Sequence, residues 1–137
     1  MMPKLTPELD WLTATAILTA VMWIPYTVQL IREMGPVAAF WDPYHETPIE
    51  AKWAQRAKRA HTNAVENLTV FAALSIGVVM AEAGTALTAW ACALFFIVRA
   101  AHYWVYVFAV PLFRTVLFLC GFICQVVLAA TLFGLIR

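Results

Sequence analysis

Four long apolar segments, separated by short polar ones, most constrain what this chain can fold into. They run over about residues 11–34, 56–82, 85–108 and 111–136. A helix needs about 20 largely apolar residues to cross the hydrocarbon core of a bilayer. In lipid, only helices and closed barrels satisfy every backbone polar group, and four segments without an alternating pattern cannot close a barrel. The pattern therefore predicts an all-α, up-down four-helix transmembrane bundle in which residues 1–137 form a single domain.

Composition excludes the soluble alternatives. Hydrophobic residues make up 64% of the 137 residues and charged residues 12%, whereas charged residues make up about 25% of an average soluble domain. A domain of this size buries only roughly two-thirds of its surface, so this much apolar surface cannot be hidden from water. The net charge of +1 provides no basic field that would attract nucleic acid. An integral, multi-pass membrane protein remains as the prediction.

Lysine and arginine residues near the ends of the spans predict the orientation of the bundle. The first connector, about residues 35–55, and its flanks carry five cations: Arg32, Lys52, Arg56, Lys58 and Arg59. The turn between the second and third spans carries none, and Arg114 follows the third span. Because cytoplasmic loops hold the excess of such cations, we expect this connector, including Asp42 to Lys52, in the cytoplasm and both termini outside it. Pro25, inside the first span, predicts a kink there.

Two stripes of polar side chains fall within the second and third spans: Arg59, Asn63 and Glu66, then Arg99, His102 and Tyr106. Their spacing places each stripe on one face of its helix. A charged group at membrane depth costs at least ~2.5–3.5 kcal/mol on insertion scales, so these residues need a reason to be there. We interpret them as a basic cavity at the cytoplasmic end, in which Arg59, Arg99 and Arg114 bind carboxylates or another anion by charge-assisted hydrogen bonds.

Less specific interpretations exist for several of these residues. Glu66 and Arg99 could form a structural ion pair between two helices, although three arginines facing one or two acids leave spare positive charge. Arg56, taken alone, is typical of a topology signal, and His102 of a hydrogen-bonded interior residue. The pair of cysteines at positions 120 and 124 has no histidine or acid beside it, so we expect no metal site.

Three motifs resemble those of one membrane family. Residues 56–67 read RAKRAHTNAVEN and resemble the second-helix signature of the MAPEG family, the membrane-associated proteins in eicosanoid and glutathione metabolism. Arg99, His102 and Tyr106 resemble the family's third-helix motif, and residues 111–115, PLFRT, resemble the start of its fourth helix. The chain is most similar to small bacterial members related to the microsomal glutathione transferases. The resemblance implies a homotrimer in the bacterial inner membrane, with glutathione bound between neighbouring subunits near the cytoplasmic side.

The resemblance also implies roles for individual residues. Arg114 matches the arginine that stabilises the glutathione thiolate, because a guanidinium near the sulfur lowers the pKa of the thiol and the thiolate is the nucleophile. The residues expected to bind glutathione are Arg32, Arg59, Asn63, Glu66, Arg99, His102, Tyr106 and Thr115. Glutathione would be a cosubstrate, and a lipophilic electrophile or hydroperoxide would enter from the bilayer. The two carboxylates and one ammonium group of glutathione suit a site with several arginines and one glutamate.

Three functional hypotheses follow. The first is a membrane glutathione transferase or glutathione-dependent peroxidase, and the second is a non-catalytic lipid- or thiol-binding protein of the same fold. The third, a small four-helix multidrug transporter, relies on an acid in its first helix, and residues 11–31 contain none. Thr62 and Phe118 stand where the similar prostaglandin E synthase has an arginine and a tyrosine, and Ala64 replaces a frequent acid. Prostaglandin and leukotriene synthesis are therefore disfavoured.

Overall fold

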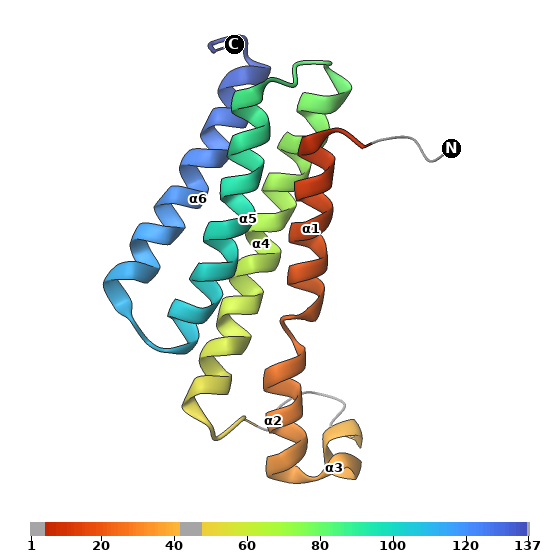
Figure 1. Cartoon of the computed structure of the whole chain (residues 1–137). Helices are drawn as coiled ribbons and strands as arrows, with labels where there is room; N and C mark the ends of the chain where they lie inside the picture. Colours follow the sequence, from red (N-terminus) through yellow and green to blue (C-terminus); the bar gives the residue numbers. More distant parts are fainter. Residues whose placement is uncertain (1–4, 42–47, 137) are drawn as a thin grey trace.

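The computed structural model describes residues 5–41 and 48–136, and all regular secondary structure within them is helical. Six helices follow one another: α1 Pro7–Val21, α2 Ile24–Met34, α3 Pro36–Trp41, α4 Lys52–Met80, α5 Ala86–Val107 and α6 Pro111–Leu132. Helices α1, α4, α5 and α6 run up and down in one bundle, with α2 and α3 at one end of it (Figure 1). The predicted all-α four-helix bundle is confirmed.

Four helical stretches are long and apolar enough to cross a membrane: Pro7–Met34, Lys52–Met80, Ala86–Val107 and Pro111–Leu132. The first of these combines α1 and α2. Many large apolar side chains stay exposed on the outside of the bundle, among them Trp90 and Phe113. Such an outer surface is stable in lipid, which is as apolar as the side chains themselves. The start of α1, the end of α6 and the α4–α5 turn lie at the end of the bundle opposite α2 and α3 (Figure 1).

The first span is broken, and the break lies upstream of the proline that causes it. Helix α1 ends at Val21 and α2 begins at Ile24, whereas the sequence predicts a kink at Pro25. Proline lacks an N–H group, and its ring clashes with the carbonyl four residues earlier, which here is that of Val21. The interruption therefore falls at Met22 and Trp23, and α2 continues below α1 toward α3 (Figure 1).

The first connector is more ordered than a polar loop. Helix α3 occupies Pro36–Trp41, where an apolar run follows a proline at the first helical position, a place that tolerates proline well. Helix α4 begins at Lys52, ahead of the expected residue 56, because no helix breaker stands between them. The rest of the predicted polar connector, Asp42 to Thr47, including the Asp42-Pro43 pair, lies outside the described residues.

A side chain from α2 caps the start of α4. Ala51, the residue before α4, makes no side-chain cap of its own. Instead the Glu33 carboxylate accepts hydrogen bonds from the backbone N–H groups of Glu50 at 2.7 Å and Ala51 at 3.0 Å. Gln29 donates a third hydrogen bond to the same carboxylate at 2.9 Å. A carboxylate at a helix N-terminus is favourable for the helix dipole, so Glu33 joins the end of α2 to the first turn of α4.

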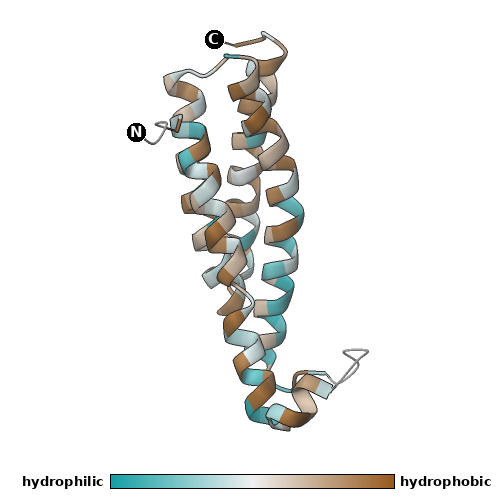
Figure 2. Cartoon of the chain, turned by 90° about the vertical axis from the view of Figure 1, so that its right-hand side faces the viewer, coloured by the Kyte–Doolittle hydropathy of each residue, from teal (hydrophilic) through white to brown (hydrophobic). Residues whose placement is uncertain are grey.

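Two apolar clusters hold the bundle together. One joins α4, α5 and α6 around Phe71 and Phe95, whose stacked rings have centroids 3.9 Å apart. In the other, small residues on α4, namely Ala57, Ala60 and Ala64, pack against Met22, Tyr103 and Val107. Small side chains let membrane helices approach closely. Because this apolar face of α4 is buried, its polar residues lie on the other faces, and they gather in the half of α4 nearer to α2 and α3 (Figure 2).

A buried acid fixes α1 to α5 at the opposite end. Glu8 is only 3% exposed, and its Oε1 accepts a hydrogen bond from the Thr88 hydroxyl at 2.6 Å. Thr85 and Thr88 also form a capping box at the start of α5. The carboxylate therefore lies at the positive end of the α5 dipole, which favours an anion there. A Cβ atom at Gly84 would lie 3.2 Å from Oε1 of Glu8, so a larger residue there would push the carboxylate aside by a few tenths of an ångström.

Candidate functional site

The two polar stripes meet where Arg99 of α5 contacts Asn63 of α4. Nη2 of Arg99 donates hydrogen bonds to Oδ1 of Asn63 at 2.6 Å and to the Asn63 backbone carbonyl at 3.3 Å. Arg99 is only 3% exposed, and among the described residues its buried Nε and Nη1 atoms have no hydrogen-bond partner. Buried polar atoms are nearly always hydrogen-bonded, so two free donors on one buried cation are unusual. They are suited to an anionic ligand.

The structure does not pair this arginine with Glu66. Within the described residues, the hydrogen bonds of Arg99 go to Asn63 and to no acid. Glu66 is exposed, one turn further along α4 than Asn63. The structural ion pair between Glu66 and Arg99 is therefore not formed within one chain, and the Glu66 carboxylate is accessible to other groups.

Aromatic side chains continue the stripe of α5. His102 is buried, and its ring lies edge-on to that of Tyr106, with centroids 5.7 Å apart. The half-buried Tyr106 ring in turn receives the guanidinium of Arg114, whose Cζ is 4.8 Å from the ring centroid. A cation over an aromatic face is attracted by the ring quadrupole. Arg114 thus has a defined position although its side chain is exposed.

A tight turn between α5 and α6 brings Arg114 back over Tyr106. Ala109 in this turn has φ +60°, a left-handed conformation that residues other than glycine rarely adopt. The N–H groups of Ala109 and Val110 bond to the carbonyls of Tyr106 and Val105, which closes the turn. Arg114 then lies in the first turn of α6, and together with Tyr106 it lines a cavity of about 200 Å³.

The remaining predicted site residues lie apart from this cluster. Arg32 is exposed near the end of α2, and Arg59 is exposed on α4. Thr115 is exposed as well, and its hydroxyl donates to the Pro111 carbonyl at 3.4 Å. A single chain therefore joins Asn63 to Arg99 and Tyr106 to Arg114, but it leaves Arg32, Arg59 and Glu66 on the outer surface.

One residue of the cluster was assigned only a topological role from the sequence. Arg56 also lines the cavity of about 200 Å³, and its Nε donates to the Val107 carbonyl at 2.8 Å. Its spacing in the sequence indicates this place, because Arg56 precedes Asn63 by seven residues and so extends the polar stripe backwards on nearly the same face of α4.

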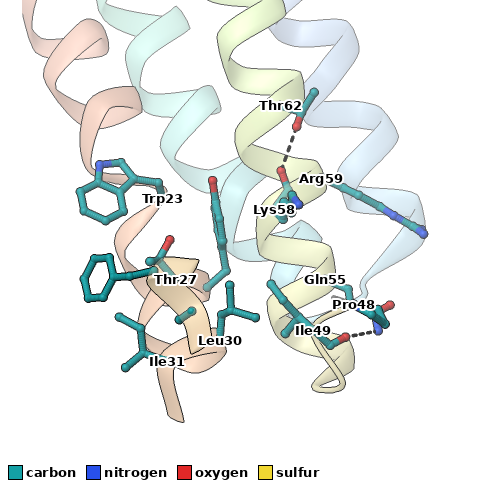
Figure 3. A pocket seen from close by; sticks show the side chains of 13 residues that line it. Trp23, Thr27, Leu30, Ile31, Pro48, Ile49, Gln55, Lys58, Arg59 and Thr62 are labelled. Carbon is teal, nitrogen blue, oxygen red and sulfur yellow. Dashed lines mark hydrogen bonds between the residues drawn. The ribbon is translucent and has the colours of Figure 1, made fainter. Parts of the chain in front are cut away.

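A second, larger pocket opens between α2, α3 and the first turns of α4, with a volume of about 900 Å³. Figure 3 shows Leu30 of α2 and Ile49 on facing sides of it, while Arg59 extends away from α2. Tyr26 contributes to its wall, and the Tyr26 hydroxyl is 2.9 Å from Nδ1 of His61. The pocket is largely apolar, although Gln55, Lys58 and Arg59 are among the residues that line it. The sequence does not predict it, because it depends on the direction that α2 takes after the break.

Comparison with known proteins decides the family. The sequence model of the MAPEG family matches residues 9–134. The chain belongs to the MAPEG family. No curated protein and no solved structure matched it. Membership supports a membrane function in glutathione or eicosanoid metabolism, in a family that includes glutathione transferases, peroxidases and non-enzymatic members. The identification from the helix motifs is confirmed.

Proposed function

We propose that this protein is a membrane glutathione transferase or glutathione-dependent peroxidase. The observation that carries the proposal is the buried Arg99, which has two unpartnered donor atoms beside Asn63. A buried charge without an opposite charge beside it is strongly destabilising, so the arrangement is best explained by a ligand that supplies negative charge. Glutathione has two carboxylates for the arginines and an ammonium group for Glu66. It is therefore the MAPEG cosubstrate whose charges complement this site.

The proposal includes a homotrimer in which neighbouring subunits complete the site. Arg59 and Glu66 are exposed on α4 within a span that is long and apolar enough to cross a membrane. Charged side chains facing lipid are costly, and such residues almost always face a bundle interior or a polar cavity. A second copy covering this face of α4 would remove them from lipid. The same contact would bring Arg32 at the end of α2 toward a neighbour's glutathione.

Arg114 is the residue we expect to act on the sulfur. Its guanidinium is held over the Tyr106 ring, 4.8 Å from the centroid, and it remains exposed to a ligand. A fixed positive charge there would lower the pKa of the glutathione thiol and keep the thiolate, which is the nucleophile. In conjugation, the thiolate forms a bond to carbon and the leaving group departs with its electron pair. His102 and Thr115 would frame the peptide around the sulfur.

The test uses the purified protein in detergent, glutathione and a chloronitrobenzene or an organic hydroperoxide. We expect conjugation or peroxide reduction, together with ultraviolet absorbance from the bound thiolate. Arg114→Ala should still bind glutathione but should lose thiolate absorbance and turnover together, since the interaction strengthens as negative charge develops. Arg114→Lys should recover only part of the turnover, because an ammonium group lacks the planar fork. Glutathione binding without either reaction would favour the non-catalytic alternative.

A further inference from the structure

Helix α3, Pro36–Trp41, carries an apolar face that the rest of the described chain leaves uncovered. Its sequence, PVAAFW, contains no polar side chain. Val37, Phe40 and Trp41 are spaced three and four residues apart, so they share one face of the helix. Their exposed fractions are 77%, 82% and 83%, whereas Ala39, which with Phe40 lines the pocket of about 900 Å³, is half-buried. A contiguous exposed face of large apolar side chains marks an interaction surface.

A glycine sets the direction in which α3 runs. Gly35, between α2 and α3, has φ +83° and ψ 157°, a backbone conformation that is essentially reserved for glycine. After this turn α3 lies beside the end of α2, on the side away from α5 and α6 (Figure 1). Figure 3 shows Arg59 extending away from α2, so the charged face of α4 that we assign to a neighbouring subunit points elsewhere. The apolar face of α3 therefore needs a different cover.

Contacts between the helices place α3 at the level of the lipid headgroups. Helix α5 ends at Val107, whose carbonyl accepts a hydrogen bond from Arg56. Glu33 binds the N–H group of Ala51, five residues before Arg56, so the corner between α2 and α3 lies about 7–8 Å beyond the end of α5 along the bundle. The headgroup layer adds about 5–8 Å on each side of the hydrocarbon core. With the hydrocarbon ending near the α5–α6 turn, α3 lies in this layer.

The exposed surface of α2 indicates the same level. Ile24 and Val28 are exposed one turn apart, within a stretch that is long and apolar enough to cross a membrane. Arg32, one turn further along α2, is exposed as well. An arginine near the end of a span places its charge among the headgroups, and tryptophan is enriched at the same depth. The lipid-facing stripe of α2 thus ends at the membrane surface, and α3 follows it directly with Trp41.

We propose that α3 is an interfacial helix, which lies in the headgroup layer of the cytoplasmic leaflet with Val37, Phe40 and Trp41 inserted among the lipids. Helices of this kind lie in the plane of the membrane and bury one apolar face at the boundary between headgroups and acyl chains. The inference does not depend on the proposed function, because it involves no group that binds glutathione. The first part of the connector is then held at the membrane surface and does not extend into the cytoplasm.

The test measures the depth of a spin label on the full-length protein in phosphatidylcholine vesicles. Collisions with oxygen, which concentrates in lipid, are compared with collisions with a water-soluble nickel chelate, and lipids labelled at the headgroup or along the acyl chain calibrate the depth. The labels are attached at Val37→Cys and, as a control on the same connector, at the exposed and charged position Glu50→Cys. Both variants also carry Cys120→Ala, because the other two cysteines are buried.

The label at position 37 should gain oxygen collisions and lose nickel collisions relative to the label at position 50, at a depth between headgroup and upper acyl chain. A label at Trp41→Cys should match it, whereas one at Ala38→Cys, about 100° around the helix, should lie closer to water. Val37 and Trp41 are both exposed, so either variant should fold, and each can replace the other if one does not.

Two results would overturn the proposal. If the label at position 37 meets the nickel chelate as freely as a label in water, α3 lies in the cytoplasm. If it is shielded from nickel and from oxygen alike, protein covers this face, either a second copy of the chain or the remainder of the connector. Equal depths at positions 37, 38 and 41 would also contradict a helix lying in the membrane plane.

Discussion

Replacing Arg99 with methionine should make the ligand-free protein more stable and abolish the stabilisation by glutathione. The variant loses both hydrogen bonds that Nη2 donates to Asn63; the short one to Oδ1 is worth about 1.5–3 kcal/mol, and the 3.3 Å one from the same nitrogen adds little. It also removes two buried donors without partners, at roughly 1–3 kcal/mol each. The balance favours the variant by about 1 kcal/mol, in line with the general behaviour of buried charges replaced by apolar side chains. For a chain of this size, that difference corresponds to a rise in Tm of roughly 2–6 °C.

With glutathione bound, the wild type should become more stable than Arg99→Met. A ligand at a hundred times its Kd stabilises the folded state by about 2.7 kcal/mol, and only the wild type should gain this. The assay is thermal unfolding in detergent with and without glutathione, with Lys52→Met as a control that removes an exposed cation from the start of α4. If Arg99→Met melts below the wild type without glutathione, the arginine is structural. If it gains as much from glutathione as the wild type, Arg99 does not bind it.

Three further predictions concern other parts of the molecule. Glu66→Gln should lower the affinity for glutathione about tenfold with little change in Tm, because Glu66 is exposed within one chain. A lower Tm at unchanged affinity would favour a structural ion pair between subunits. Glu8→Ala should lower the free energy of unfolding by about 2 kcal/mol through loss of the Thr88 hydrogen bond, and chemical unfolding at constant glutathione would measure it. For topology, Glu50→Cys should resist a membrane-impermeant thiol reagent in intact cells and react after permeabilisation; labelling before permeabilisation would contradict a cytoplasmic connector.

Much of the fold could be predicted because lipid leaves few alternatives. Apolar runs of sufficient length identify the four spans, and the short turns between the later spans make the helices antiparallel neighbours. The α2–α3 end could not be predicted in the same way. The steric effect of Pro25 is local, but the direction that the chain takes after Met22 depends on how α2 meets α4. The pocket of about 900 Å³ follows from that direction.

Spacing in the sequence predicts which site residues share a helix face, but it does not predict which side chains they contact. Residues three, four and seven apart share a face, so the stripes on α4 and α5 could be recognised. Which partner each side chain meets depends on how the helices rotate against one another, and the packing of small residues such as Ala60 sets that rotation. The sequence therefore left open whether Arg99 pairs with Glu66 or binds another group. In the structure it is Asn63.

The capping of α4 by Glu33 affects how freely the length of the first connector can change. The Glu33 carboxylate binds the backbone N–H groups of Glu50 and Ala51, so the end of α2 and the start of α4 are joined directly across the connector between them. Because of these hydrogen bonds, the number of residues in this connector does not determine where α4 starts. Insertions and deletions beyond α3 should therefore be tolerated without shifting the register of Arg59 and Asn63 against α5. The connector is then the part of this protein whose length evolution can change at little cost to the bundle.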